Sequence, residues 1–281
     1  MRVRRKRRYW RSLTTVSFIA LIAVVAVLAL LMQVSKQGNN EYSDLGIFNP
    51  SHNHSLTDGE SSGANELVAA FAKTHNLSLD AWPEKLIELL ESNPDAKDFV
   101  LNYPLKKDLK QPVDLSEHKN SKAVPLFFQW DERWGYTEYG NEIMGLSGCG
   151  PTCLSMVCIF LLNDTKYTPR YIADFAQENG YCVPGSGSAW TLISIGGEEL
   201  GLDVTEIPLD ENRIIRNLEV GNPIICVMGP GDFTTTGHFI VMTDYVDGKI
   251  KVNDPNSPTR SEMLWDFNDI RGQIRNLWVC R

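Results

Sequence analysis

The segment Gly148-Cys149-Gly150-Pro151-Thr152 leads directly into an apolar run that ends at Leu162, and it constrains the fold of this chain more than any other feature. The run is apolar almost all round, which indicates a helix buried at the centre of a domain. Proline is favoured in the first turn of a helix, because the N–H group that it lacks would have no partner there. The sequence therefore predicts a central helix from Pro151 to Leu162, with Cys149 at its N-terminus.

Cys149 is a candidate nucleophile. The free N–H groups and the positive end of the dipole at a helix N-terminus stabilise thiolate over thiol, which lowers the pKa from roughly 8.5. The alternative is a buried structural cysteine. The cysteine spacing matches neither a disulfide framework nor a zinc site, so we expect no metal and no cofactor. The six are Cys149, Cys153, Cys158, Cys182, Cys226 and Cys280.

Around and after the central helix, helical patterns come first and strand patterns follow. An extended segment is expected with Val124, Leu126 and Phe128 on one face. The further helices are expected at Tyr167–Glu178, at Ser188–Gly201 with Ser188 as N-cap, and at Asn212–Val220. The strands are expected at Pro223–Met228, His238–Met242, Lys249–Asn253 and Arg275–Val279, with Asp247-Gly248 as a hairpin turn. Helices followed by antiparallel strands predict an α+β domain with segregated halves.

A cysteine nucleophile needs a proton acceptor, and histidine suits this role because its pKa lies near 6.5. His238 is the single histidine within the expected domain, at the start of a strand that follows a glycine-rich loop. The other four lie before the domain, at His52, His54, His75 and His118. We therefore expect His238 to face a cleft as the catalytic base, and a histidine that only caps the strand end is the alternative.

An imidazole base needs a third group that fixes its tautomer. Asp254 ends the second strand of the expected hairpin, which brings it back toward His238, and Asn253 and Asp244 are rival orienting groups. The developing oxyanion needs a donor such as a side-chain amide. Gln129, beside two tryptophans and at the end of the extended segment, is the candidate for this role.

The N-terminal segment predicts a membrane anchor. Seven arginines and lysines precede an uncharged apolar run from Leu13 to about Val34, which is long enough to cross a bilayer. The positive-inside rule places the cations in the cytoplasm and the rest of the chain outside. A cleaved signal peptide is the alternative, since the small residues between Ala20 and Ala29 suit a processing site.

The portion beyond this anchor is acidic. The whole chain has a net charge of −8, and without the seven N-terminal cations the remainder carries −15. Such a surface argues against nucleic acid as a partner, because like charges repel. After a polar linker, helical patterns appear at Asn65–Thr74 and Pro83–Ser92, and Pro94, Pro104 and Pro112 are expected to break up the chain that follows. We expect these short helices to form a small arm without a core of its own.

Four motifs in order resemble the stand-alone relatives of the bacteriocin-processing, double-glycine cysteine peptidases. The motifs are Gln129-Trp130-Asp131-Glu132-Arg133-Trp134, Gly148-Cys149-Gly150-Pro151-Thr152, Gly237-His238-Phe239-Ile240-Val241 and Val252-Asn253-Asp254-Pro255. The resemblance implies a papain-like fold from about Val124 onward. It also implies that Cys149 is the nucleophile, His238 the base, Asp254 the orienting residue and Gln129 the oxyanion donor.

Two features depart from bacteriocin processors. Their glutamine stands only a few residues before the cysteine, whereas Gln129 is farther from Cys149, and no transporter segment accompanies the peptidase in these 281 residues. The double-glycine preference is therefore not carried over. The expected organisation is a basic cytoplasmic segment at 1–12, a transmembrane helix at 13–34, a flexible linker at 35–63, a helical arm at 64–120 and a papain-like peptidase domain at 121–281.

The leading prediction is thus a membrane-anchored, extracellular cysteine peptidase that acts on a peptide or protein. A second possibility keeps the same residues and makes the substrate a cell-wall peptide or another amide. A third is a papain-like module that binds peptides without cutting them, which would predict a damaged triad. All of the required residue types are present, at Cys149, His238, Asp254 and Gln129.

Overall fold

The computed structural model describes residues 63–281. The expected basic segment, the expected membrane helix and nearly all of the expected linker lie outside these described residues. Within residues 63–281, no helix is both long enough and apolar enough to cross a bilayer. The α-helices are α2 (Gly63–His75), α3 (Glu84–Ser92), α4 (Lys97–Lys106), α5 (Met144–Ser147), α6 (Cys149–Leu162), α7 (Pro169–Glu178), α8 (Gly197–Glu199), α9 (Glu211–Glu219), α10 (Pro258–Glu262) and α11 (Phe267–Ile270).

The strands form one large antiparallel sheet and two small hairpins. They are β1 (Glu138–Tyr139), β2 (Glu142–Ile143), β3 (Cys182–Val183), β4 (Gly187–Ser188), β5 (Val204–Glu206), β6 (Ile224–Met228), β7 (His238–Val246), β8 (Lys249–Asn253), β9 (Leu264–Trp265) and β10 (Ile274–Cys280). The large sheet has the order β5-β10-β6-β7-β8-β9, and every pairing in it is antiparallel. The last strand therefore lies inside the sheet, between β5 and β6, and completes it.

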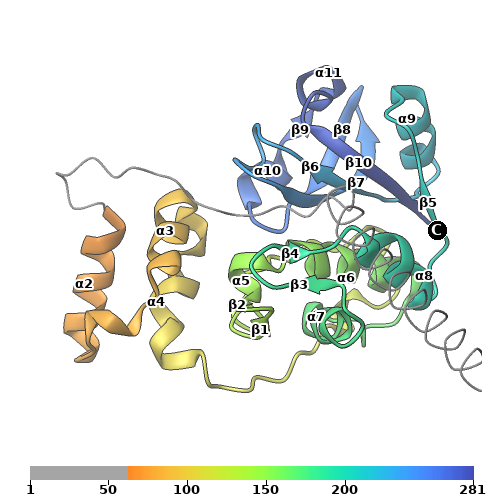
Figure 1. Ribbon diagram of the computed structural model, residues 1–281. Helices are drawn as coiled ribbons and strands as arrows, with labels where there is room; N and C mark the ends of the chain where they lie inside the picture. Colours follow the sequence, from red (N-terminus) through yellow and green to blue (C-terminus); the bar gives the residue numbers. More distant parts are fainter. Residues whose placement is uncertain (1–62) are drawn as a thin grey trace, which may run out of the picture. The chain divides into compact units, whose positions relative to one another are not determined.

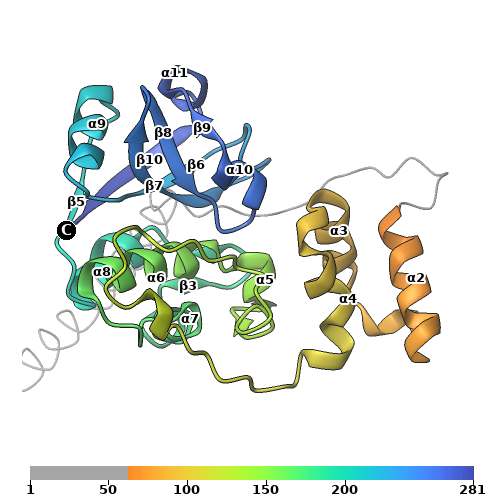
Figure 2. The ribbon, with the colours of Figure 1, turned by 180° about the vertical axis from the view of Figure 1, so that it is seen from behind.

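Helices cover both faces of this sheet (Figure 1). On one face, Ile225, Val227, Phe239 and Val241 pack in a cluster with α6 and α7. On the other face, Ile224, Cys226, Ile240 and Met242 pack with α9 and α11. Seen from behind, the two layers again lie on opposite sides of the strands (Figure 2). All five residues of β6 are buried for this reason, and the domain is α+β, as predicted.

The elements agree closely with the predicted ranges in this domain. The central helix α6 begins at Cys149, two residues before the predicted start, so the thiol belongs to the first helical residue. Thr168 caps α7 by accepting a hydrogen bond from the Tyr171 N–H, and Asp210 caps α9 in the same way through Arg213. The turn at Asp247 and Gly248 joins β7 to β8, as the hairpin signal predicted.

Two local predictions within residues 121–281 are wrong. Ser188 is not an N-cap: it pairs with Cys182 in the small β3-β4 hairpin, and the helical segment after it begins at Thr191 and is wound as a π-helix at Leu192–Gly196. The extended segment before Gln129 has no strand partner, and its buried face differs from the predicted one by a single residue. Leu126 is exposed, and the buried positions are Pro125, Phe127 and Gln129.

The helices α2, α3 and α4, called the arm below, pack on the rest of the described chain through one apolar cluster. Leu86 of α3 and Phe99 of α4 are buried in this cluster together with Tyr136, and Trp130 and Leu146 pack against it. The Phe99 ring lies on Gly135 and Gly145. A Cβ would come within 2.6 Å of this ring at Gly135 and within 2.4 Å at Gly145. The arm therefore completes its core with residues that lie after it in the chain.

Pro104 does not break the chain as predicted, because it lies inside α4. A proline at this position leaves the carbonyl four residues earlier, that of Val100, without its helical N–H donor. The Trp82 indole N–H donates to this carbonyl over 2.8 Å. Packing of Phe99, Val100 and Leu101 into the arm cluster favours the helix, and the tryptophan satisfies the carbonyl that proline leaves free.

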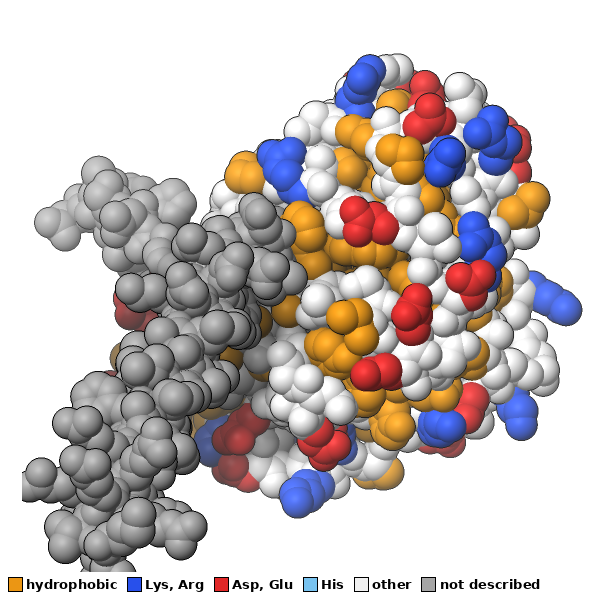
Figure 3. Space-filling view, turned by 45° about the vertical axis from the view of Figure 1, so that its right-hand side comes forward, with side chains coloured by type: hydrophobic (Ala, Val, Ile, Leu, Met, Phe, Trp, Pro, Cys, Tyr) orange, Lys and Arg blue, Asp and Glu red, His pale blue; other side chains and the backbone are white. Residues whose placement is uncertain are grey.

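Charged side chains of both signs are interspersed with apolar ones on the face drawn in Figure 3. Neither sign dominates that face. This face therefore presents no broad patch of one charge, whereas several polar residues are buried next to α6.

Candidate active site

Cys149 is held by two glycines that the packing requires. A Cβ at Gly148 would lie 2.6 Å from the Met144 carbonyl oxygen, and one at Gly150 would lie 2.5 Å from the Ser188 hydroxyl oxygen. Neither glycine has a positive φ. The glycines are therefore needed for close approach of neighbouring backbone and side chains, and they let α6 begin at a partly exposed Cys149.

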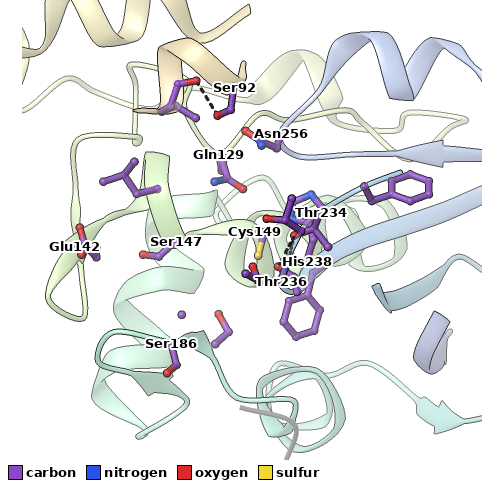
Figure 4. A pocket seen from close by; sticks show the side chains of 18 of the residues that line it. Ser92, Gln129, Glu142, Ser147, Cys149, Ser186, Thr234, Thr236, His238 and Asn256 are labelled. Carbon is purple, nitrogen blue, oxygen red and sulfur yellow. Dashed lines mark hydrogen bonds between the residues drawn. The ribbon is translucent and has the colours of Figure 1, made fainter. Parts of the chain in front are cut away.

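His238 is the first residue of β7, opposite Met228 of β6, and it is only 7% exposed. Its Nε2 lies 2.7 Å from Oδ1 of Asp254. Nδ1 is consequently the ring nitrogen left for Cys149, and Figure 4 shows the Cys149 sulfur and His238 together at the cavity. Strand pairing explains this proximity, because Val241 lies opposite Asn253 and Asp254 follows directly.

Asp254 is completely buried and all of its polar atoms have partners. Besides His238, Oδ1 accepts a hydrogen bond from the Asn256 N–H at 2.8 Å, and Oδ2 accepts one from Arg260 Nε at 2.5 Å. The rival groups lie elsewhere. Asn253 donates to the carbonyls of the segment before Gln129, and Asp244 is exposed and accepts from the N–H of the next residue.

Gln129 is 4% exposed and lies at the same cavity. Its backbone N–H donates to the Pro255 carbonyl at 2.7 Å, so it is attached to the turn that follows Asp254. Its Nε2 donates to the Gly145 carbonyl at 3.0 Å, which leaves a second N–H, and among the described residues Oε1 has no hydrogen-bond partner. This buried amide therefore keeps one N–H and its carbonyl oxygen without a hydrogen-bond partner among the described residues.

Gln129, Cys149 and His238 line a cavity of about 460 Å³, and Asp254 lies buried behind His238. Its walls come from α3, from the segment around Ser147, from the β3-β4 hairpin and from the loop before His238. Hydroxyl groups line much of it, several of which Figure 4 labels: Ser92, Ser147, Ser186, Ser188, Thr234, Thr235 and Thr236. The cavity is large enough for a few residues of an extended chain, and it opens beside the Cys149 thiol.

Electrostatics single out Cys149 among the six cysteines. Burial alone would raise the pKa of its thiol, but the hydrogen bond and charge of His238, together with the Phe239 and Gly150 N–H groups, lower that pKa below its ordinary value. Burial raises the pKa of the remaining five thiols: Cys153, Cys158, Cys182, Cys226 and Cys280. Cys149 is thus the one cysteine whose surroundings favour a thiolate.

His238 has the complementary shift. Burial would lower the pKa of its imidazole, but the charge and hydrogen bond of Asp254 and the contact with Cys149 raise that pKa to about 10. For Asp254, burial acts to raise the pKa, while His238 and Arg260 hold it below its usual value. These shifts favour a thiolate beside an imidazolium, with an ionised carboxylate behind it.

The structure places three of the predicted residues, Gln129, Cys149 and His238, at one cavity and Asp254 behind His238, and it adds two features that the sequence analysis missed. Arg260 binds Asp254 from α10, a helix of only five residues that begins after the N-cap Ser257. The arm also lines the cavity, through Lys85, Glu88, Leu89 and Ser92. Among the residues described, no cluster of three or more histidine, cysteine or acidic side chains could hold a metal ion.

The family assignment follows from residues 121–279, which match the model of the Peptidase_C39 like family. This match spans more than half of the chain. The chain belongs to the Peptidase_C39 like family. This membership confirms the resemblance that the four motifs predicted.

Two solved structures resemble this Peptidase_C39 like chain. One is the peptidase domain of Streptococcus ComA, a bi-functional ABC transporter involved in a quorum sensing pathway, with 14% identity, a TM-score of 0.36, and coverage of 47% of this chain and 89% of that one. The other is a putative C39-like peptidase from Bacillus anthracis, with 13% identity, a TM-score of 0.33, and coverage of 61% and 98%. No curated protein matches the chain.

Proposed function

We propose that this protein is a cysteine peptidase that hydrolyses peptide bonds through Cys149, His238 and Asp254. The observation that carries the proposal is the buried hydrogen bond from His238 to Asp254, at 2.7 Å, beside the one thiol whose pKa is lowered. A nucleophile, a proton carrier and an orienting carboxylate in one row are what acyl transfer to a thiol needs.

In the proposed reaction, the Cys149 thiolate attacks the carbonyl carbon of the scissile bond. The π-electron pair of the C=O bond moves to the carbonyl oxygen, which becomes an oxyanion. The second Nε2–H of Gln129 stabilises this oxyanion, together with the Cys149 backbone N–H, which has no carbonyl partner within α6. His238 then gives its Nδ1 proton to the leaving nitrogen as the C–N bond breaks. A thioester on Cys149 remains.

Water completes the proposed cycle. His238, now neutral, takes a proton from a water molecule that attacks the thioester carbonyl, and the C–S bond breaks to release a carboxylic acid and the thiolate. Asp254 keeps its charge throughout and stabilises the imidazolium at both proton transfers.

The charges of the cavity favour neutral or basic peptides as substrates. Its cationic groups are paired, Lys85 with Glu142, and both Arg260 and His238 with Asp254. Glu88 and Asp232 also line it, and neither has an ion-pair partner among the described residues. An anionic substrate, such as a carboxylate-rich cell-wall peptide, would meet two uncompensated carboxylates here.

The membrane anchor and the exterior location remain part of the proposal. They rest on the seven cations and the apolar run from Leu13 to Val34, which predict a single span with the peptidase outside. A tethered enzyme of this kind would act on peptides at the cell surface.

The test uses the full chain in detergent, an activated thiol probe and two peptide pools that differ only by lysine or glutamate. We expect the probe to modify Cys149 first, and Cys149→Ala to abolish hydrolysis, with the lysine pool cut faster by the wild type. Cys182→Ala is the matched control, because Cys182 is also partly exposed but its pKa is raised. Peptide binding by the wild type without turnover would instead identify a binding module.

A further inference from the structure

Asp254 has a second cationic partner that acyl transfer to a thiol does not by itself require. Its Oδ1 faces His238, and its Oδ2 accepts from Arg260 Nε at 2.5 Å. The Arg260 side chain is 25% exposed and borders the cavity, whereas Asp254 is not exposed at all. The ion pair between them therefore joins a buried carboxylate to a partly exposed guanidinium at the edge of the cavity.

Counting the charges shows what this contact changes. With Cys149 as thiolate, His238 as imidazolium and Asp254 as carboxylate, the three groups carry one uncompensated negative charge in a buried place. Such a charge is costly, and it raises the pKa of every acid around it. Arg260 brings the sum to zero, so that the charges alternate in sign from Cys149 to Arg260.

The short helix α10 is built to hold this arginine. Ser257 caps α10 by accepting from the Arg260 N–H at 3.2 Å, and the Trp265 indole N–H donates to the Arg260 carbonyl at 3.1 Å. The next residue, Ser261, accepts from the Asp254 N–H through its hydroxyl oxygen at 2.9 Å. One turn of helix thus contacts both the backbone and the carboxylate of Asp254.

We propose that Arg260 is a positioning residue, which neutralises Asp254 and fixes its carboxylate so that Oδ1 stays on His238. The inference rests on the proposed function of Cys149, His238 and Asp254. The carboxylate cannot rotate freely, because Oδ1 also accepts from the Asn256 N–H. The other titratable group that faces Asp254 is Cys153 of α6, a thiol that burial and the Asp254 charge keep protonated.

Removal of the arginine should shift the pKa values of its neighbours in one direction. Loss of a cation favours protonation of each neighbouring group, so the pKa values of Asp254, His238 and Cys149 should all rise. An opposite charge in contact shifts a pKa by roughly 1–3 units. Since Arg260 acts on Cys149 and His238 through Asp254, we expect shifts at the low end of this range for them.

The experiment measures the pH dependence of Cys149 alkylation by iodoacetamide and of peptide hydrolysis in the full chain. In Arg260→Gln, we expect the acid limb of alkylation and both limbs of hydrolysis to move up by about one pH unit, with a lower kcat and a KM within about two-fold. Arg260→Lys keeps the charge and should stay near the wild-type limbs. Arg271 is exposed and directly follows α11, so Arg271→Gln should leave all limbs of the pH profiles at the wild-type pH.

If the limbs of the pH profiles of Arg260→Gln stay at the wild-type pH, the proposal is overturned, even if the rate falls. A purely structural loss would lower the rate equally at each pH. A shift in Arg260→Lys as large as in Arg260→Gln would also overturn it. Alkylation does not require a substrate. If no peptide is hydrolysed but the alkylation limb shifts as expected, the proposed peptidase function fails while the assignment of Arg260 stands.

Discussion

At the scale of single residues, burial and partners act on a thiol in opposite directions. Cys153 follows Cys149 by one helical turn in α6, and burial raises its pKa. Cys149 is buried enough for the same effect, yet His238 and two backbone N–H groups outweigh it. Position at the helix start and contact with one histidine therefore decide which cysteine is reactive, and residue type alone does not.

These opposed shifts predict the pH range of activity. The ion pair exists above the lowered pKa of Cys149 and below the pKa of His238, which is about 10. As the pH falls through the pKa of Cys149, the thiolate is protonated. As the pH rises through the pKa of His238, the imidazolium loses the proton that it would give to the leaving nitrogen. We expect a bell-shaped profile of kcat/KM whose alkaline limb lies near pH 10.

His238→Ala provides the check on this profile. Without the imidazolium, burial should raise the pKa of Cys149, so the midpoint of iodoacetamide alkylation should move up, and hydrolysis should fall by about 10²- to 10⁴-fold. His118→Ala is the matched control, because His118 contacts Phe127 and lies outside the cavity. An unchanged alkylation midpoint in His238→Ala would remove His238 from the mechanism.

At the scale of elements, long periodic segments could be predicted and short ones could not. The hairpin of β7 and β8 followed from Asp247 and Gly248, and it placed Asp254 beside His238. The five residues of α10 are too few to show a helical period, so Arg260 gave no signal. Ser188 resembled an N-cap because it precedes an apolar run, but tertiary pairing with Cys182 decides its structure.

The arm was the least predictable element, because its contacts join residues far apart in the sequence. Prolines suggested an interrupted chain, whereas the Trp82 indole satisfies the carbonyl that Pro104 leaves free. Its position at the cavity depends on the pairs Lys85 with Glu142 and Asn93 with Asn256. Such pairs between distant segments have no periodic signature in a single sequence.

Phe99→Ala tests whether the arm supports the active site. Phe99 is 2% exposed, lies on Gly145 and stacks on Tyr136, and the Gly145 carbonyl holds the Gln129 amide. Truncation of a buried phenylalanine typically costs about 3–5 kcal/mol. We expect a lower melting temperature and a lower kcat, with an unchanged pH midpoint for alkylation, because Phe99 does not act on the thiol.

Leu105→Ala is the control for that experiment, since Leu105 is on the same helix α4 but exposed. It should leave both melting and kcat near wild type. Gly145→Ala should reproduce the Phe99→Ala effect, because its Cβ would lie 2.4 Å from the phenylalanine ring. Full activity in Phe99→Ala would show that the arm does not support the oxyanion donor.

At the scale of the whole molecule, the charge is unevenly divided along the chain. Seven cations precede the apolar run and the remainder carries a net charge of −15. The acidic body would draw basic peptides toward a cavity in which Glu88 and Asp232 are unpaired. The same division of charge underlies the proposed topology, because cations next to a span stay on the cytoplasmic side.

This topology predicts which side of the membrane the Cys149 thiol faces. In intact cells that express the full chain with Cys182→Ala, a membrane-impermeant charged maleimide should label Cys149, since the remaining cysteines are buried. Permeabilisation should add little further signal. Ser12→Cys, placed in a background with both Cys149→Ala and Cys182→Ala, is the internal control and should be labelled only after permeabilisation, because residue 12 precedes the predicted span. Labelling of Cys149 that requires permeabilisation would place the peptidase inside the cell, where it would meet a different set of peptides.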